Sequence, residues 1–278
     1  MLRFEDGSGF DESNWDDSAY LEHNEMYYNG VDVLPNGTVL ISVTAAVEHR
    51  HPDDEGVPES FPNATLPGCV GGLLNFIGRW NPAGGDYDWQ TSDFAWVPRR
   101  VSTRGLVETA VSQLTNGRIL LIARGSNAGL DPLECPGRKW MTISQDGGLT
   151  WGPVTDLRFD TGEQFYSPCS MPATIRSTRT GKLYFVGNVT DTPPRGNGPR
   201  HPLVIAEIDE DSPALKKDTL TVIDDRIPET EAPSMGLWGK PFENRETLDL
   251  ELFLTRHWTH ADPAEKWTAD AYRYRITL

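Results

Sequence analysis

The chain has 278 residues, long enough for one large all-β domain or two smaller domains. Its formal net charge of −16 argues against a nucleic-acid partner and would repel an anionic sugar at long range, so such a sugar would need a local cluster of arginines. The 26 glycines, 21 prolines and 9 tryptophans are typical of a turn-rich all-β sandwich, barrel or propeller.

A strand–turn–strand pattern recurs along the chain. Its first copy, residues 31–41, has β-branched runs on either side of an Asn-Gly pair, which is a strong hairpin signal. Residues 111–121 repeat the pattern around a second Asn-Gly pair, and residues 173–186 repeat it around Thr-Gly. A second, broader hairpin follows each copy. The repeating unit is therefore four antiparallel strands, which is a propeller blade.

This repeat predicts three blades and part of a fourth. The three blades cover roughly residues 27–97, 106–158 and 170–224. The fourth begins near residue 231, with strands at 248–254 and 271–276. Its last strand is missing, and the N-terminal segment is a candidate to supply it.

The second hairpin of the middle blade passes through the stretch Ser144-Gln145-Asp146-Gly147-Gly148-Leu149-Thr150-Trp151. Its Asp carboxylate can cap backbone N–H groups of its own turn, and its glycines tolerate positive φ. Trp151 is expected to pack between sheets. The stretch matches Ser-x-Asp-x-Gly-x-Thr-Trp, the Asp box or BNR repeat, and so resembles the sialidase family. In that family the Asp box lies away from the active site, so it indicates architecture.

The resemblance implies an all-β, sialidase-like β-propeller of four-stranded antiparallel blades, forming a single domain over residues 1–278. A sialidase propeller has six blades, whereas four are visible here. Either the first and last segments contain further strands, or the chain is shortened at its N-terminal side and lacks blades there. We favour the second interpretation.

Aligning the three hairpins on their turns singles out one charged pair. Glu108 and Arg124 lie eight residues before and after Asn116, so we expect them opposite one another with their side chains on the same face. The equivalent positions in the other two hairpins hold no charged pair. A pair in one blade alone indicates a site at the mouth of the central channel. A cross-strand salt bridge that only stabilises the hairpin is the alternative.

The family resemblance supports the same residues. Residues 107–124 resemble the sialidase segment that carries the Glu partner of the nucleophile and one arginine of the carboxylate-binding triad. On this resemblance Glu108 is a catalytic residue and Arg124 binds substrate. Arg200 matches an arginine that contacts substrate in the BNR-repeat group.

Three further residues complete the predicted site. Asp53 lies in a long polar loop after the first hairpin, where the family has its acid/base Asp, and Asp54 is an alternative at the same place. Tyr166 is a candidate to line the central pocket. His201, beside Arg200, is a candidate general base and substrate contact.

Two family features are absent. Residues 27–30 contain no arginine where the first triad arginine is expected, and residues 232–241 contain no tyrosine to act as nucleophile. Three functions remain open: a sialidase-like glycoside hydrolase acting on an anionic or neutral glycan, a polysaccharide lyase using His or Tyr as base against a uronate, and a non-catalytic glycan-binding propeller. We expect the first, with a carbohydrate as its partner.

Other classes of site have little support. The 3 cysteines allow at most one intramolecular disulfide and have no metal-site spacing. No apolar run is long enough to cross a membrane, and the first residues lack the shape of a signal peptide. We expect no metal, no cofactor, no membrane span and a monomer, and the compartment stays open.

Overall fold

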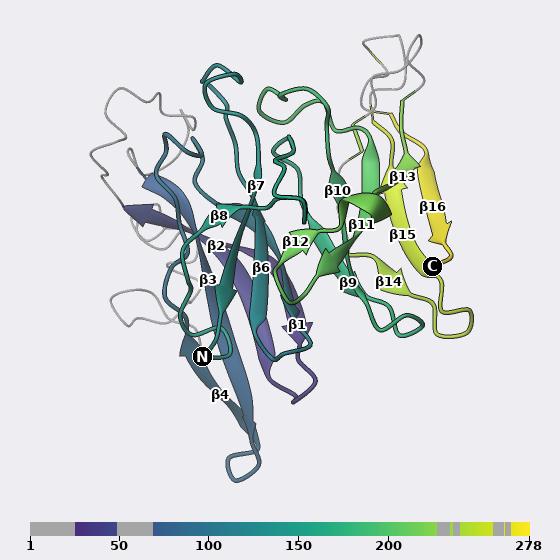
Figure 1. Cartoon of the computed structure of the whole chain (residues 1–278). Coiled ribbons are helices and arrows are strands. Elements are labelled where there is room, and N and C mark those ends of the chain that lie inside the picture. The colour runs from purple at the N-terminus through teal and green to yellow at the C-terminus, as the bar shows by residue number, and fades with distance from the viewer. Residues whose placement is uncertain (1–25, 49–68, 227–233, 236–239, 258–263, 265–267) are drawn as a thin grey trace.

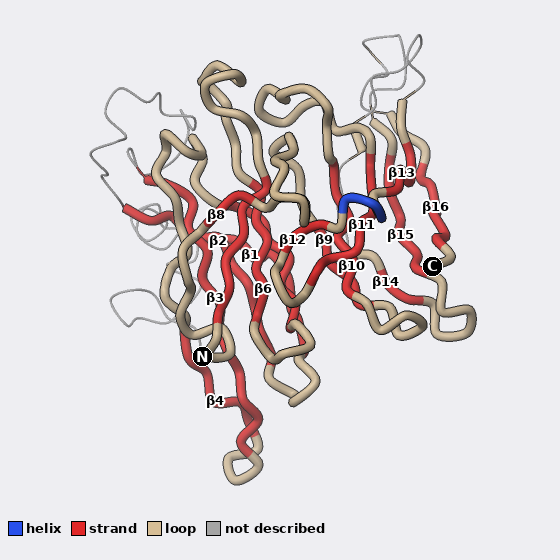
Figure 2. Tube along the Cα trace, in the orientation of Figure 1, coloured by secondary structure: helices blue, strands red, loops and turns tan. Residues whose placement is uncertain are grey.

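The computed structural model describes residues 26–48, 69–226, 234–235, 240–257, 264 and 268–278. Within them, the regular structure is β-strand apart from one 3-10 turn, η2 (Lys217–Thr219). The strands form antiparallel sheets that follow one another along the chain as the blades of a propeller (Figures 1 and 2). The all-β propeller predicted from the repeats is confirmed.

Each blade is one sheet of consecutive strands. Blade 1 contains β1 (Met26–Val33), β2 (Val39–Glu48), β3 (Cys69–Asn81) and β4 (Asp86–Thr91). Blade 2 contains β5 (Val107–Gln113), β6 (Ile119–Arg124), β7 (Lys139–Ser144) and β8 (Thr155–Asp156). Blade 3 contains β9 (Ala173–Arg176), β10 (Leu183–Asn188), β11 (Leu203–Asp209), β12 (Ala214–Leu215) and β13 (Thr221–Asp224). Blade 4 contains β14 (Phe242–Glu243), β15 (Leu250–Thr255) and β16 (Ala271–Ile276).

The blade boundaries agree with those predicted from the repeats, and two details differ. In blade 3 the outermost position is shared, because both β12 and β13 pair with β11. In blade 4 the sequence pattern missed β14, a two-residue strand too short to show a period. Among the described residues blade 4 has three strands.

The hydrophobic core lies between the blades. One cluster joins blades 1 and 2, a second joins blades 2 and 3, and a third joins blades 3 and 4. Each middle blade is therefore covered on both faces. This explains why β6 and β10 are buried at every position and read as continuous apolar runs, without the alternation of a half-exposed strand.

The turn after β7 is held by its own side chains, as its sequence predicts. Asp146 Oδ1 accepts hydrogen bonds from the backbone N–H groups of Leu149, at 3.1 Å, and Thr150, at 2.9 Å. The Thr150 hydroxyl donates to Asp146 Oδ2 at 2.6 Å, and Ser144 Oγ accepts from Gly148 N at 2.8 Å. The hydrogen bonds from Thr150 and Ser144 lower the pKa of Asp146 to about 2.

Trp151, at the end of this turn, packs between blades 1 and 2 as expected. Its ring packs on the first hydrophobic cluster, which contains Leu40 and Ile77 of blade 1. Its Nε1 donates to Ser92 Oγ at 3.4 Å. The turn thus anchors the outer edge of blade 2 to its neighbour.

Replacing Asp146 by alanine should lower the free energy of unfolding by about 1–2 kcal/mol, the scale of a lost cap. The contribution should be present above the ordinary aspartate pKa and lost as the pH falls through about 2, because the folded pKa is depressed. Urea unfolding at pH 7 and at low pH measures both effects. Equal stability of variant and wild type at pH 7 would rule out a structural role for the carboxylate.

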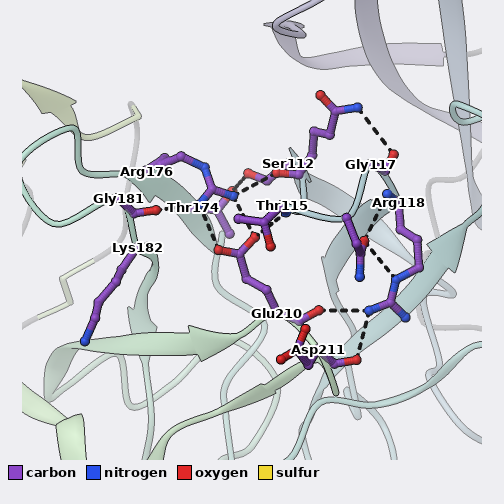
Figure 3. A network of polar contacts seen from close by, with 12 residues as sticks. Ser112, Thr115, Gly117, Arg118, Thr174, Arg176, Gly181, Lys182, Glu210 and Asp211 are labelled. Carbon is purple, nitrogen blue, oxygen red and sulfur yellow. Dashed lines mark hydrogen bonds and ion pairs between the residues drawn. The ribbon is translucent and has the colours of Figure 1, made fainter.

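A polar network joins blades 2 and 3 on the hairpin side (Figure 3). Glu210, in the turn after β11, accepts hydrogen bonds from Arg176 to both carboxylate oxygens, at 2.8 and 2.7 Å, and from Thr115 N at 2.7 Å. Arg118 donates to the carbonyl oxygens of Glu210 and Asp211. Burial raises the pKa of Glu210, but the Arg176 and Thr115 hydrogen bonds outweigh it and the net pKa is lowered.

Replacing Glu210 by glutamine should lower the free energy of unfolding by about 2–3 kcal/mol, because it removes charge-assisted hydrogen bonds from a half-buried guanidinium. The effect should be present above the ordinary glutamate pKa and lost on acidification, since the folded pKa is depressed. Glu163→Gln is the matched control: its pair with Lys217 is about half exposed, so it should cost under about 1 kcal/mol. Equal losses for the two variants, measured by urea unfolding, would contradict the expected ranking.

Candidate functional site

The candidate site begins at an irregularity in β5. Val107 is the backbone partner of Arg124 and Thr109 is the partner of Ala123, so Glu108 is an extra residue in a β-bulge. Its φ is 45°, a left-handed value that is strained for a residue with a side chain. Strained backbone of this kind is concentrated at functional sites. Glu108 N is held by a hydrogen bond of 3.2 Å to Thr44 Oγ1 of blade 1.

Glu108 and Arg124 form an ion pair in which Arg124 Nε lies 2.7 Å from Glu108 Oε2. The Glu108 side chain is 21% exposed and that of Arg124 is 11% exposed. The two side chains meet across the hairpin, but the predicted backbone register differs by one residue, because the bulge makes Val107 the partner of Arg124. Both paired atoms are buried, and within the described residues neither has a well-aligned hydrogen bond.

Arg200, in the segment between β10 and β11, reaches the same backbone carbonyl as Arg124. Its Nη2 donates to the Cys169 carbonyl oxygen at 3.0 Å, and Nη1 of Arg124 donates to the same oxygen at 3.4 Å. Its Nε also donates to Asn197 O at 3.1 Å. The structure therefore brings Glu108, Arg124 and Arg200 together, although 76 residues separate the two arginines.

Lys139 lies beneath this group. It is the first residue of β7 and the direct backbone partner of Arg124, so two cations face each other across adjacent strands. The side chain is fully buried, and its Nζ donates to Pro168 O at 2.9 Å and to Ser170 Oγ at 3.4 Å. Burial, the largest cause, and the neighbouring Arg124 lower the pKa of Lys139 to about 7, against an opposing effect of Cys169.

The electrostatics of the group favour an anion. Burial lowers the pKa of Arg200, and the charges of Arg124 and Arg104 lower it further, against opposing effects of Cys169 and of the Glu108 carboxylate. Cationic side chains that lie close together in a half-buried site repel one another, and a bound anion offsets this repulsion. The cluster is notable in a chain whose net charge is −16, because the long-range field would not attract an anion.

The structure shows the contacts of two other predicted site residues, Tyr166 and His201. Tyr166 lies under the Arg138 guanidinium, 4.8 Å from ring centroid to Cζ, and within the described residues no hydrogen bond or ion pair joins it to Glu108 or the two arginines. His201 faces Asp225, with 3.2 Å between Nδ1 and Oδ1. Burial lowers the pKa of His201, and Arg226 lowers it further, against Asp225. Asp53 lies outside the described residues.

The sequence patterns missed Lys139 and the backbone of Cys169. A lysine at the start of a strand ordinarily faces solvent, and a carbonyl acceptor has no signal in the sequence. The alignment of β6 with β7 carried the one available hint, because it places Lys139 opposite Arg124.

Metal and membrane sites have no support in the described part of the chain. No group of three or more His, Cys, Asp or Glu residues there has the geometry of a metal site. No helix there is long and apolar enough to span a membrane.

Comparison with known proteins identifies the fold. No protein-family model matches the chain, and no curated protein sequence matches it. The NanB sialidase of Streptococcus pneumoniae superposes over 92% of this chain and 32% of its own, with 14% identity and a TM-score of 0.56. The intramolecular trans-sialidase of Ruminococcus gnavus superposes over 92% of this chain and 45% of its own, with 12% identity and a TM-score of 0.51.

The chain is a sialidase-like propeller. At identities of 14% and 12%, the likeness shows a shared fold and not a shared activity. The sialidase-like propeller spans less than half the length of either of these proteins.

Proposed function

We propose that the sialidase-like propeller is a glycoside hydrolase that acts on a glycan carrying a carboxylate. The observation that supports it best is the convergence of Arg124 and Arg200 on one carbonyl oxygen beside Glu108. Two guanidinium groups at one point offer paired hydrogen bonds that match the geometry of a carboxylate. The fold shared with two sialidases is consistent with this ligand class.

Each residue has a distinct role in this proposal. Arg124 and Arg200 bind the sugar carboxylate. Glu108, held by its bulge and by the ion pair, takes a proton from the water that attacks the anomeric carbon as the glycosidic bond breaks. Asp53 is the proposed acid that protonates the leaving oxygen, and its role rests on the sequence argument alone.

A non-catalytic glycan-binding propeller is the second candidate. Two features of the sequence favour it: residues 232–241 contain no tyrosine that could act as nucleophile, and residues 27–30 contain no arginine for a third contact to the carboxylate. A lyase receives less support. It needs a His or Tyr base next to the carboxylate-binding arginines, and His201 faces Asp225.

A glycan-array screen followed by turnover assays on the ligands found tests the proposal. The array should pair each carboxylated glycan, sialylated or uronate-containing, with the neutral glycan of the same linkage. We expect binding of carboxylated members, loss of binding to their neutral partners, and release of a reducing sugar. Binding without any turnover would favour the binding propeller. Products that absorb in the near ultraviolet would show elimination, and binding that ignores the carboxylate would exclude the proposed ligand class.

A further inference from the structure

The segment that carries the shared acceptor is a tight turn fixed on several sides. Ser170 N donates to Pro168 O at 2.7 Å, so the turn closes around Cys169. Cys169 N donates to Gly196 O at 2.8 Å, and Ser167 Oγ donates to Asn188 O at 2.6 Å. Cys169 is thereby held at the centre of the turn.

Lys139 is a charged side chain that donates hydrogen bonds to this turn. Its Nζ contacts Pro168 O and Ser170 Oγ, one residue on either side of Cys169. The ammonium therefore holds both ends of the turn whose central carbonyl accepts from Arg124 and Arg200. A fully buried lysine with these contacts has no role in the chemistry described above.

We propose that Lys139 is a positioning residue, which holds the 168–170 turn so that the Cys169 carbonyl aligns the guanidinium groups of Arg124 and Arg200. This inference deepens the proposed function, since it concerns the same anion site. It also makes a prediction about the arginines that needs no ligand. A lysine that only filled space would leave their orientation independent of its charge.

The alignment should depend on pH near neutrality. Four groups influence the ammonium: Arg124 of β6, Glu108 of the bulge, Cys169 of the turn and Arg200 of the segment before β11. Because burial lowers the pKa of Lys139 to about 7, the ammonium loses its proton there, and with it the positive charge that strengthens its two hydrogen bonds to the turn. The unfolded chain keeps this proton to about pH 10, so folding stability should rise with pH between these values.

Arginine side-chain NMR tests the proposal without a ligand. The Nε–Hε signals of Arg124 and Arg200, assigned with Arg124→Lys and Arg200→Lys, are followed from pH 6 to pH 9 in wild type, Lys139→Met and Lys139→Arg. Wild type should show a common inflection near pH 7 for both arginines. Lys139→Met should abolish it and broaden the signals. Lys139→Arg, which stays charged, should abolish the inflection and keep the signals sharp, and it carries the test if Lys139→Met does not fold.

Two controls identify the titrating group. Lys217→Met removes an exposed lysine paired with Glu163, and the inflection should persist. Cys169→Ser keeps the backbone carbonyl and removes the thiol, and again the inflection should persist. An inflection that survives in Lys139→Met, that disappears in Cys169→Ser, or that is absent from wild type overturns the proposal. The proposed function would be unaffected, since its test measures glycan binding and turnover.

Discussion

Replacing Glu108 by glutamine should lower kcat about 10²–10⁴-fold, the usual contribution of one acid–base group. Glutamine has nearly the same shape and can lie against Arg124 in the same place, but it cannot accept a proton. Substrate binding should change little, because the two arginines remain. The measurement is steady-state turnover on the best ligand from the array, with kcat and KM determined separately.

A matched control separates chemistry from folding. Glu163→Gln makes the same chemical change at an exposed ion pair, and it should leave kcat unaltered. The melting temperature of Glu108→Gln should stay within a few degrees of wild type, since the shape of the bulge is preserved. Full turnover in Glu108→Gln would remove Glu108 from the chemistry. A large fall in melting temperature would show that Glu108 serves mainly to stabilise the hairpin.

Replacing Arg200 by alanine should weaken binding of a carboxylated glycan about 10- to 100-fold, which corresponds to the loss of charge-assisted hydrogen bonds. Binding of any neutral glycan should not change, because the guanidinium acts on the carboxylate. Arg200→Lys should recover only part of the affinity, since an ammonium keeps the charge and loses the planar pair of donors. Titration calorimetry measures the dissociation constants of wild type, Arg200→Ala and Arg200→Lys.

Arg195→Ala is the control for Arg200, because Arg195 lies in the same segment and is exposed. It should bind as wild type does. If Arg195→Ala and Arg200→Ala weaken binding equally, the loss of affinity comes from the overall positive charge of the segment and not from a specific contact of Arg200. The carboxylate would then not be held at the point where Arg124 and Arg200 converge.

The sequence determined the blades by itself. Each Asn-Gly hairpin is a local structure, because glycine supplies the positive φ of its own turn, as at Gly37 and Gly117. The turn around Asp146 is local in the same sense, since its carboxylate accepts from residues three and four positions later. Such hydrogen bonds depend on near neighbours along the chain, so a sequence pattern can predict them.

The sequence also indicated the pair of Glu108 and Arg124, because register within one hairpin follows from the turn. It could not show the bulge, which depends on the neighbouring blade: Glu108 N is bonded to Thr44 of β2. The distances of Glu108 and Arg124 from the turn, counted along the sequence, carry no sign of this extra residue. The ion pair was therefore predictable and its strained backbone was not.

Only the tertiary structure decided the rest of the site. Arg200 meets Arg124 because blades 2 and 3 pack side by side and both arginines reach the Cys169 carbonyl, a backbone acceptor without a sequence signature. Lys139 is buried because the 168–170 turn covers it, which its own strand does not reveal. The contacts of Tyr166 with Arg138 and of His201 with Asp225 were hidden for the same reason: they depend on which face each segment presents after packing.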